Sequence, residues 1–196
     1  MPSKTLDYYS KNAASFAADT FSVDFAATRD RFLAGLAPGA SILDLGCGAG
    51  RDTKAFLERG FLVTAADGSP ELCALASVYT GIPVRRMLFS ELIEQDAYDG
   101  VWACASLLHV PSAELPDIFR HVITALKPGG LFYTSFKYGT FEGERNGRYF
   151  TDFTEASFDA FLERFSELTT EAQWISADVR PGRSAERWLN LLIRKT

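Results

Sequence analysis

A run of glycines after a short apolar segment is the pattern in this chain with the most chemical content. Gly46, Gly48 and Gly50 follow the short, mainly apolar segment 41–45, and Asp67 ends the next apolar segment. Glycines at such a turn leave room for a ligand where Cβ atoms would intrude. A carboxylate roughly 20 residues further on can accept hydrogen bonds from both hydroxyls of a ribose. The spacing therefore predicts a site for a cofactor that contains adenosine.

The same loop discriminates between two kinds of adenosine cofactor. A dinucleotide fingerprint, G-x-G-x-x-G starting at Gly46, needs its third glycine at the position that Arg51 occupies. Asp44, just before the glycines, would repel a phosphate but can help to hold an ammonium group, such as that of a methionine moiety. Both features favour S-adenosylmethionine. A nicotinamide-dependent oxidoreductase on a similar nucleotide-binding fold is the alternative.

Strands that alternate with helices position this loop. The predicted strands are 41–45, 61–66, 83–87, 100–105 and 131–136, and the predicted helices between and after them are 51–59, one opening at 69–71, 113–126 and 154–165. Two short amphipathic helices, 6–18 and 25–36, precede the first strand, with Asp24 as the expected N-cap of the second. The last two predicted strands, 168–179 and 188–194, flank the short turn Arg180-Pro181-Gly182-Arg183, so they must pair antiparallel.

These elements predict an α/β fold with a Rossmann-like, doubly wound sheet that is mainly parallel and closes with an antiparallel C-terminal hairpin. We expect a single domain over 1–196, with 1–37 as a helical lid segment and 38–196 as the core. In such sheets the ligand lies beyond the carboxyl ends of the strands.

Three stretches of the chain resemble motifs of a known family. The run 42–52, ILDLGCGAGRD, is similar to the first motif of the class I S-adenosylmethionine-dependent methyltransferases. The run 64–70, TAADGSP, resembles their second motif, and 126–131, LKPGGL, resembles the turn before their fifth strand. Within the family the chain looks most like the small bacterial members grouped with the tellurite-resistance methyltransferases. The resemblance implies an enzyme that takes a methyl group from S-adenosylmethionine and releases S-adenosylhomocysteine.

The resemblance also implies roles for individual residues. The glycine loop would line the methionine part, Asp67 would hold the ribose, and Gly68 and Ser69 would flank the adenine. Many family members carry an acidic residue in the adenine slot, where this chain has Leu88 and Phe89, so backbone groups are expected to substitute. The expected cofactor-binding residues are Asp44, Gly46, Cys47, Gly48, Gly50, Arg51, Asp67, Gly68, Ser69, Leu88, Phe89 and Ala105.

His109 is the candidate catalytic residue. Methyl transfer from a sulfonium is a direct displacement, so orientation in a dry pocket matters more than an elaborate catalytic triad. His109 follows the fourth predicted strand and could serve as a general base at neutral pH. The alternative is that its ring only hydrogen-bonds a loop carbonyl.

Five further residues are candidates for substrate binding. Tyr8 and Tyr9, with Phe16 behind them, are expected lid residues, or else core aromatics at helical spacing. Lys137, Tyr138 and Arg148 lie in a stretch after the fifth strand that is rich in charged and aromatic residues. They are expected to bind and orient an anionic substrate, or else to form the ordinary salt bridges of a solvated loop.

The composition of the chain limits the kinds of molecule that it is expected to bind. The net charge of −5 offers no attraction to nucleic acid, so a small-molecule substrate is expected. The N-terminal residues lack the apolar core of a signal peptide, and no apolar run suits a membrane span, so a cytoplasmic location is expected. Cys47, Cys73 and Cys104 show no zinc-site spacing, and we expect no metal. The acceptor atom, the oligomeric state and a cofactor-binding module without catalysis stay open.

Overall fold

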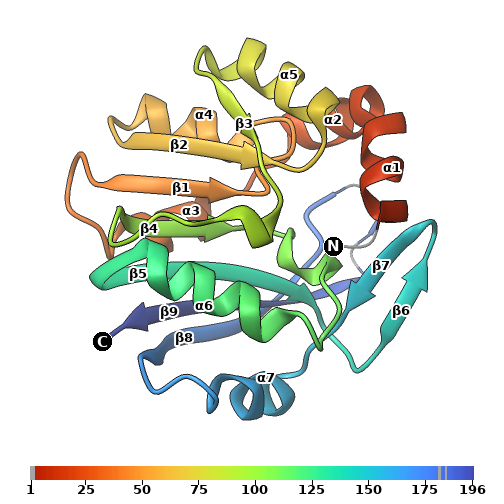
Figure 1. Cartoon of the computed structure of the whole chain (residues 1–196). Helices are drawn as coiled ribbons and strands as arrows, with labels where there is room; N and C mark the ends of the chain where they lie inside the picture. Colours follow the sequence, from red (N-terminus) through yellow and green to blue (C-terminus); the bar gives the residue numbers. More distant parts are fainter. Residues whose placement is uncertain (1–2, 181, 184) are drawn as a thin grey trace.

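A central seven-stranded sheet organises the part of the chain that the computed structural model describes, residues 3–180, 182–183 and 185–196 (Figure 1). Its strands are β1 (Ser41–Leu45), β2 (Leu62–Asp67), β3 (Val84–Arg86), β4 (Tyr98–Ala103), β5 (Leu126–Lys137), β8 (Leu168–Ala177) and β9 (Arg187–Lys195). Their order is β3-β2-β1-β4-β5-β9-β8; the first five are parallel, and β9 pairs antiparallel with both β5 and β8. The predicted sheet and its closing hairpin are confirmed, while Pro181 of the predicted turn lies outside the described residues.

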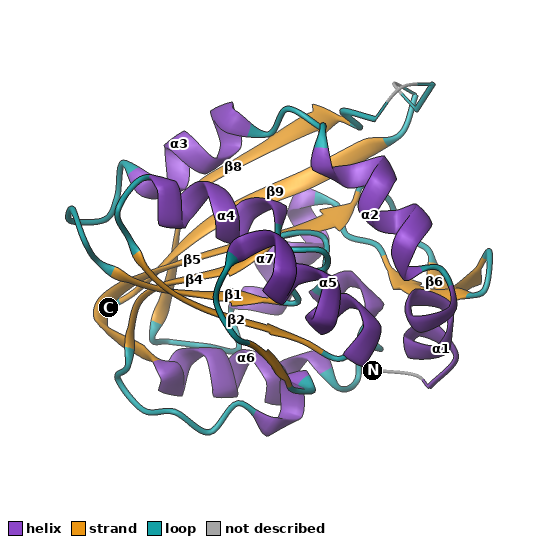
Figure 2. Ribbon diagram, turned by 90° about the horizontal axis from the view of Figure 1, so that it is seen from above, coloured by secondary structure: helices purple, strands orange, loops and turns teal. Residues whose placement is uncertain are grey.

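Helices cover both faces of the sheet. They are α3 (Ala26–Leu33), α4 (Arg51–Glu58), α5 (Pro70–Thr80), α6 (Leu115–Ala125) and α7 (Glu155–Leu162), with short 3₁₀ turns η1 (Phe89–Glu91) and η2 (Leu107–His109). Figure 2 shows α3 and α4 on one side of the sheet and α6 on the other. On the α3 side Trp102 stacks on Tyr133 with ring centroids 4.0 Å apart. On the other side Phe119 of α6 packs against Phe161 of α7.

The N-terminal segment forms two helices, α1 (Ser3–Lys11) and α2 (Ala13–Phe21), so the prediction of one helix over 6–18 was wrong. The break falls at Asn12, whose side-chain amide donates to the Tyr8 carbonyl at 2.7 Å. Such a side-chain bond competes with the helical ladder. The break lets α1 and α2 lie side by side at the carboxyl ends of the parallel strands (Figure 1).

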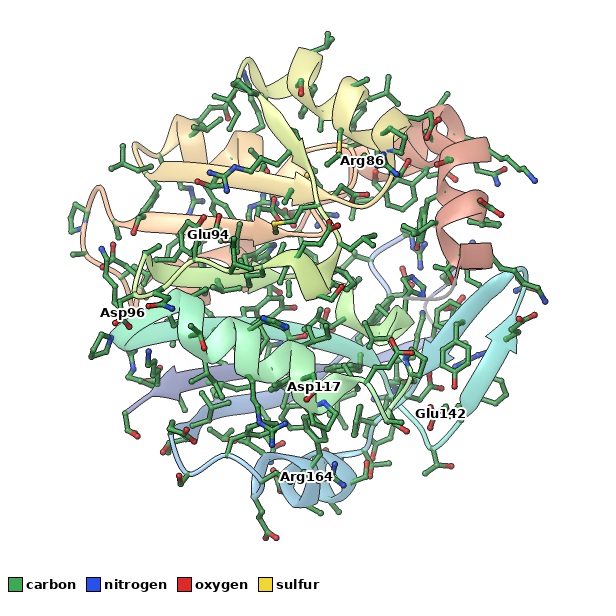
Figure 3. The ribbon with its side chains drawn as sticks, viewed as in Figure 1. Arg86, Glu94, Asp96, Asp117, Glu142 and Arg164 are labelled. Atoms are coloured by element: carbon green, nitrogen blue, oxygen red, sulfur yellow. The ribbon has the colours of Figure 1, made fainter. Side chains whose placement is uncertain are left out.

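A second, two-stranded sheet replaces most of the loop expected after the fifth strand. It consists of β6 (Glu142–Arg145) and β7 (Arg148–Thr151). Asn146 and Gly147 connect them with φ of 50° and 76°, the positive values that a two-residue hairpin turn requires. Glu142, labelled in Figure 3, accepts hydrogen bonds from the Tyr149 hydroxyl and the Ser112 N–H, both at 2.8 Å, which fixes the hairpin to the segment after η2.

The fourth and fifth strands begin earlier than predicted. β4 starts at Tyr98 and ends at Ala103, two residues short of the expected 105. Ala105 has a φ of 52°, a left-handed conformation that a strand does not contain. β5 starts at Leu126, which pairs with Tyr98, and its register with β4 shifts between Tyr98 and Gly100. Among the described residues, the helices are all too short or too polar to cross a membrane.

Candidate active site

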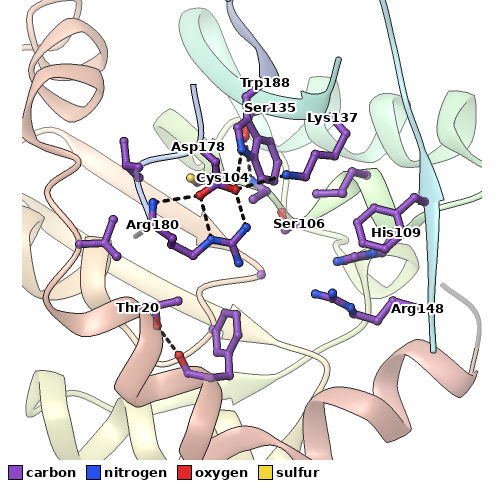
Figure 4. A pocket seen from close by; sticks show the side chains of 18 of the residues that line it. Thr20, Cys104, Ser106, His109, Ser135, Lys137, Arg148, Asp178, Arg180 and Trp188 are labelled. Carbon is purple, nitrogen blue, oxygen red and sulfur yellow. Dashed lines mark hydrogen bonds and ion pairs between the residues drawn. The ribbon is translucent and has the colours of Figure 1, made fainter. Parts of the chain in front are cut away.

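A cavity of about 550 Å³ lies at the carboxyl ends of the parallel strands, within the roughly 300–1,000 Å³ of small-molecule sites. Its walls come from the glycine loop after β1, the end of β2, the segment after β4, the lid helices, and strands β7 and β9. Figure 4 shows side chains from these separate elements pointing into one space. The position is the one expected for a ligand in a parallel α/β sheet.

The glycine loop turns sharply from β1 toward β2. The N–H groups of Gly46 and Cys47 both donate to the Ala66 carbonyl, at 2.8 and 3.0 Å. Gly46 has a φ of 81°, and a Cβ there would lie 2.5 Å from the Ser106 Cβ. Gly48 has a φ of 57°, and its Cβ would lie 2.9 Å from a ring carbon of Phe16. Only glycine fits these two positions, and both line the cavity.

Asp67 ends β2 with its carboxylate at the cavity. Its two oxygens accept the N–H groups of Gly48 and Ser69, each at 2.9 Å. Burial raises the pKa of Asp67 to about 6, although the backbone hydrogen bonds from Ser69, Gly48 and Gly68 oppose the rise. The carboxylate is therefore mainly ionised at neutral pH. Because each oxygen can accept more than one hydrogen bond, Asp67 retains capacity for a pair of ribose hydroxyls.

Asp44 provides a second buried carboxyl group in the cavity wall. It is 2% exposed, and its Oδ2 accepts the Thr53 hydroxyl at 2.6 Å. Burial, followed by the negative charge of Asp52, raises the pKa of Asp44 to about 8. A nearby cation would favour the ionised form. The site therefore suits a ligand that brings its own ammonium group.

Arg51 lines the cavity, but its charge is already compensated. Its guanidinium donates to both oxygens of Asp52, at 2.9 and 2.7 Å. Asp52 also accepts from Arg29 at 2.8 Å and from the Trp102 indole at 3.0 Å. This buried network anchors the first turn of α4 to α3 and β4, which gives Arg51 a structural role next to the site.

Some of the remaining predicted cofactor-binding residues line the cavity and others do not. Gly68 and Phe89 line the cavity together with Cys47 and Ala105. Ser69 lies outside the lining, is fully buried, and caps α5 by accepting the Leu72 N–H at 3.3 Å. Leu88 is 37% exposed and also lies outside it. Gly50 packs against α5 instead, where a Cβ would lie 2.7 Å from Thr80.

His109 projects from η2 into the cavity next to Tyr9 and Arg148. Its Nδ1 lies 2.6 Å from the Tyr149 carbonyl, which can only accept, so Nδ1 carries the proton. Nε2 is then an acceptor, and the Tyr9 hydroxyl donates to it at 2.8 Å. Burial lowers the pKa of His109 to about 4, the Tyr149 hydrogen bond opposes this, and the charge of Arg148 lowers it further. The ring is a neutral hydrogen-bond acceptor.

We expect His109 to titrate near pH 4 in the folded protein, with its proton on Nδ1 above that pH. An unfolded histidine takes up a proton near pH 6.5, so burial of the neutral ring makes folding progressively less favourable as the pH falls from about 6.5 toward 4. Nitrogen NMR of the protein with labelled histidine, recorded between about pH 3 and 8, measures the pKa of His109 and shows which ring nitrogen carries the proton. The resonance that is missing in His109→Gln belongs to His109. A midpoint near 6.5, or a proton on Nε2, would contradict this geometry.

The lid segment is docked across the cavity by polar contacts at both ends of α1. The hydroxyl of Ser10 lies 3.2 Å from that of Ser69, and Thr5 accepts the Tyr149 N–H at 2.9 Å. Tyr9 lines the cavity. Tyr8 does not, and its ring centroid lies 4.6 Å from the central carbon of the Arg148 guanidinium. The lid therefore links the cofactor side to the β6–β7 hairpin.

Lys137 and Tyr138 line the cavity at the end of β5. Lys137 contacts Glu186, lies 3.3 Å from Asp178, and sits 4.0 Å above the Trp188 ring. Its positive charge is thus balanced by the chain itself, which matches the alternative interpretation of a salt-bridged lysine. Tyr138 is 38% exposed at the cavity edge.

The β8–β9 end supplies a wall that the sequence analysis missed. Asp178 accepts from Arg180 and from the Trp188 indole, the latter at 3.1 Å, as Figure 4 shows. Asn190, on buried β9, accepts the Tyr133 hydroxyl at 2.7 Å. The one usable signal was a polar asparagine within an otherwise apolar strand.

Comparison with known proteins agrees with this geometry. Residues 42–130 match the family model described as "Methyltransferase domain". A ubiquinone biosynthesis O-methyltransferase of Xylella fastidiosa (strain 9a5c) is 39% identical over 105 residues, which cover 50% of this chain and 42% of that protein. The chain therefore spans less than half the length of this curated relative.

Solved structures extend the match to nearly the whole chain. The Burkholderia thailandensis 1,6-didemethyltoxoflavin-N1-methyltransferase, solved with 1,6-didemethyltoxoflavin and S-adenosylhomocysteine, is 27% identical with a TM-score of 0.72, and the alignment covers 98% of this chain and 90% of that one. The chain is thus similar to the class I S-adenosylmethionine-dependent methyltransferases in sequence over residues 42–130 and in fold over nearly its whole length. The fold is shared more widely: the magnesium protoporphyrin IX methyltransferase of Synechocystis PCC 6803, with bound S-adenosylhomocysteine, has a TM-score of 0.74 at 18% identity over 98% of this chain and 99% of that one.

The methyl donor of this family is S-adenosylmethionine, and the residues of the cavity fit it. The glycine loop offers backbone that a Cβ would obstruct, Asp67 offers an ionised carboxylate, and buried Asp44 suits an ammonium group. The narrower resemblance to the tellurite-resistance members stays a prediction.

Proposed function

We propose that this protein transfers a methyl group from S-adenosylmethionine to a small-molecule acceptor in the cytoplasm. One observation carries the proposal: the glycine loop and Asp67 share a single cavity with His109, Tyr9 and Arg148. A cofactor seated on the loop would therefore face the polar wall across the same space. When bound, the cofactor supplies an already activated methyl group on a sulfonium.

The residues of the chain contribute binding and orientation. Gly46 and Gly48 make room for the methionine part, and Asp67 accepts the ribose hydroxyls. The Nε2 atom of neutral His109 can accept a proton from a hydroxyl or amine of the methyl acceptor. The proton passes directly if the acceptor displaces the Tyr9 hydroxyl from Nε2, or through the Tyr9 hydroxyl if that hydrogen bond is kept. Helices α1 and α2 act as a lid that keeps water away from the reacting atoms.

The proposed roles of the substrate-binding residues depend on whether their charges are already paired within the chain. Arg148 and Tyr9 are proposed to contact the acceptor directly, and Tyr8 to support Arg148 from behind. Lys137 and Tyr138 are proposed to shape the far edge of the cavity, because Lys137 is already held by Asp178 and Glu186. The acceptor is a small metabolite, with metalloid oxyanions such as tellurite as a second class to be tested.

Calorimetric titration tests the cofactor. S-adenosylmethionine and S-adenosylhomocysteine are expected to bind in the micromolar range, and NADH is expected not to bind. An enzyme would then move a ¹³C-labelled methyl group from the donor to a compound in a metabolite mixture, which mass spectrometry detects. Tighter binding of NADH than of either sulfur compound would support the oxidoreductase instead. Cofactor binding with no labelled product from any mixture or from tellurite would support a module without catalysis.

A further inference from the structure

The β7 wall of the cavity carries a cation, Arg148, that has no counter-charge among the residues the structure describes. Arg148 lines the cavity, and its Nε is buried with no hydrogen-bond partner among the described residues. Its Nη1 donates to the Tyr9 hydroxyl at 3.4 Å, a long contact with a neutral group. A buried guanidinium N–H without an acceptor has a free-energy cost that a ligand can remove by supplying the missing acceptor.

Four of the other cations that line the cavity are already paired. Each of these four bonds a carboxylate of the chain, the pairs being Arg51–Asp52, Lys137–Asp178, Arg145–Asp152 and Arg180–Asp178. Arg148 forms no ion pair with any described residue. Arg187 at the cavity edge forms none either, but it is exposed, so water can solvate its charge. The contrast marks Arg148 as a group kept free for a ligand.

Aromatic rings hold the guanidinium in position. Its central carbon lies 4.6 Å from the Tyr8 ring centroid, 5.2 Å from that of Phe150 and 5.8 Å from that of Tyr9. Figure 4 shows Arg148 and His109 side by side at the cavity. A charged fork fixed by stacking is preorganised, so little side-chain entropy is lost when it binds an anion.

His109 adds no charge to this corner. Its Nδ1 proton is committed to the Tyr149 carbonyl, and burial keeps the pKa of the ring low. Arg148 is therefore the source of positive charge beside the Tyr9–His109 hydrogen bond. Phe150 and Trp188 also line the cavity, which gives an occupant apolar surface as well as a cationic contact.

We propose that the methyl acceptor is a small organic acid whose carboxylate pairs with Arg148. A planar carboxylate matches the fork of a guanidinium with two parallel hydrogen bonds, and the aromatic walls suit an organic body better than a bare inorganic ion. This inference rests on the proposed function, because it places the organic acid in the space beside the bound cofactor.

Calorimetric titration of the protein saturated with S-adenosylhomocysteine tests the inference without turnover. The probes are acetate, benzoate and 4-hydroxybenzoate, each compared with its uncharged amide, and tellurite and selenite as inorganic anions. At least one carboxylate is expected to bind more than tenfold tighter than its amide and tighter than either inorganic anion. Arg148→Gln is expected to weaken that binding by about tenfold to a hundredfold, the range for a lost charge-assisted hydrogen bond, and Arg148→Lys by less.

Arg120→Gln is the matched control, since Arg120 is an exposed arginine on α6 that does not line the cavity. Its loss of one positive charge is expected to leave carboxylate binding unchanged. The inference is overturned if no carboxylate binds, if amides bind equally well, if tellurite or selenite binds more tightly, or if Arg148→Gln binds carboxylates as the native protein does. Affinity for S-adenosylhomocysteine, measured on every variant, separates these outcomes from a failure of the proposed function.

Discussion

Gly46→Ala is expected to destabilise the folded protein by about 2 to 5 kcal/mol. Holding a residue with a Cβ in the left-handed conformation costs roughly 1 to 2 kcal/mol, and forcing an atom into packed surroundings costs about 1 to 3 kcal/mol more. Both apply here, because Gly46 has a φ of 81° and its Cβ would lie 2.5 Å from the Ser106 Cβ. Urea unfolding measures the loss in the free energy of unfolding, and the dependence of that free energy on urea concentration is expected to be the same in the variant and the native protein.

Gly60→Ala is the matched control for this substitution. Gly60 has a φ of 83°, yet nothing lies within 4 Å of its Cβ position. The variant should therefore lose only the backbone contribution, about 1 to 2 kcal/mol, and should bind cofactor normally. Equal losses in the two variants would mean that the contact between Gly46 and Ser106 does not constrain the loop.

Asp67→Ala is expected to weaken binding of S-adenosylmethionine by about 1 to 3 kcal/mol, through the loss of charge-assisted hydrogen bonds. Asp67→Asn should be only a partial rescue. An amide offers one oxygen, whereas the carboxylate uses one oxygen for the Gly48 N–H and the other for the Ser69 N–H. The exposed Asp117 on α6 provides the control Asp117→Asn. Calorimetry that finds native affinity in Asp67→Ala would remove this residue from the site.

The affinity for cofactor is also expected to depend on pH through Asp67. Its pKa of about 6 in the free protein means that protonation competes with the ribose hydroxyls below pH 6. Affinity should fall there by up to roughly tenfold per pH unit. Asp44, whose pKa is about 8 in the free protein, adds a slope of its own if the ammonium group of the cofactor favours its ionised form, so the contribution of Asp67 is the difference between the native protein and Asp67→Asn. Asp67→Asn should show a smaller slope than the native protein between about pH 5 and 7, and the same slope in both proteins would assign the titration elsewhere.

The proximity of the proposed cofactor residues was predictable because they are close in sequence. Gly46, Gly48 and Asp67 lie at the ends of two adjacent parallel strands, so alternation of strands and helices was enough to bring them together. The hairpin turn at Asn146-Gly147 carried a usable sequence signal as well. It was missed because the surrounding charged residues favoured a loop.

The proposed substrate side of the site depends on contacts between residues far apart in the sequence, which local sequence patterns do not predict. Lys137 meets Asp178 across 41 positions of sequence, and Tyr9 meets His109 across 100. Both contacts follow from tertiary placement: β9 inserts between β5 and β8, and the break at Asn12 folds α1 back over the cavity. His109, Tyr9 and Arg148 were predictable as candidates, but the hydrogen bond between Tyr9 and His109 was not, nor was the lack of a counter-charge for Arg148 among the described residues.

A crystal structure of the protein with S-adenosylhomocysteine would show whether the cofactor binds at the glycine loop and Asp67. We expect both ribose oxygens within hydrogen-bond distance of the Asp67 carboxylate, the amino-acid tail along the backbone of residues 46–48, and the sulfur facing the wall that holds His109 and Arg148. A ligand bound elsewhere, or a ribose turned away from that carboxylate, would contradict it.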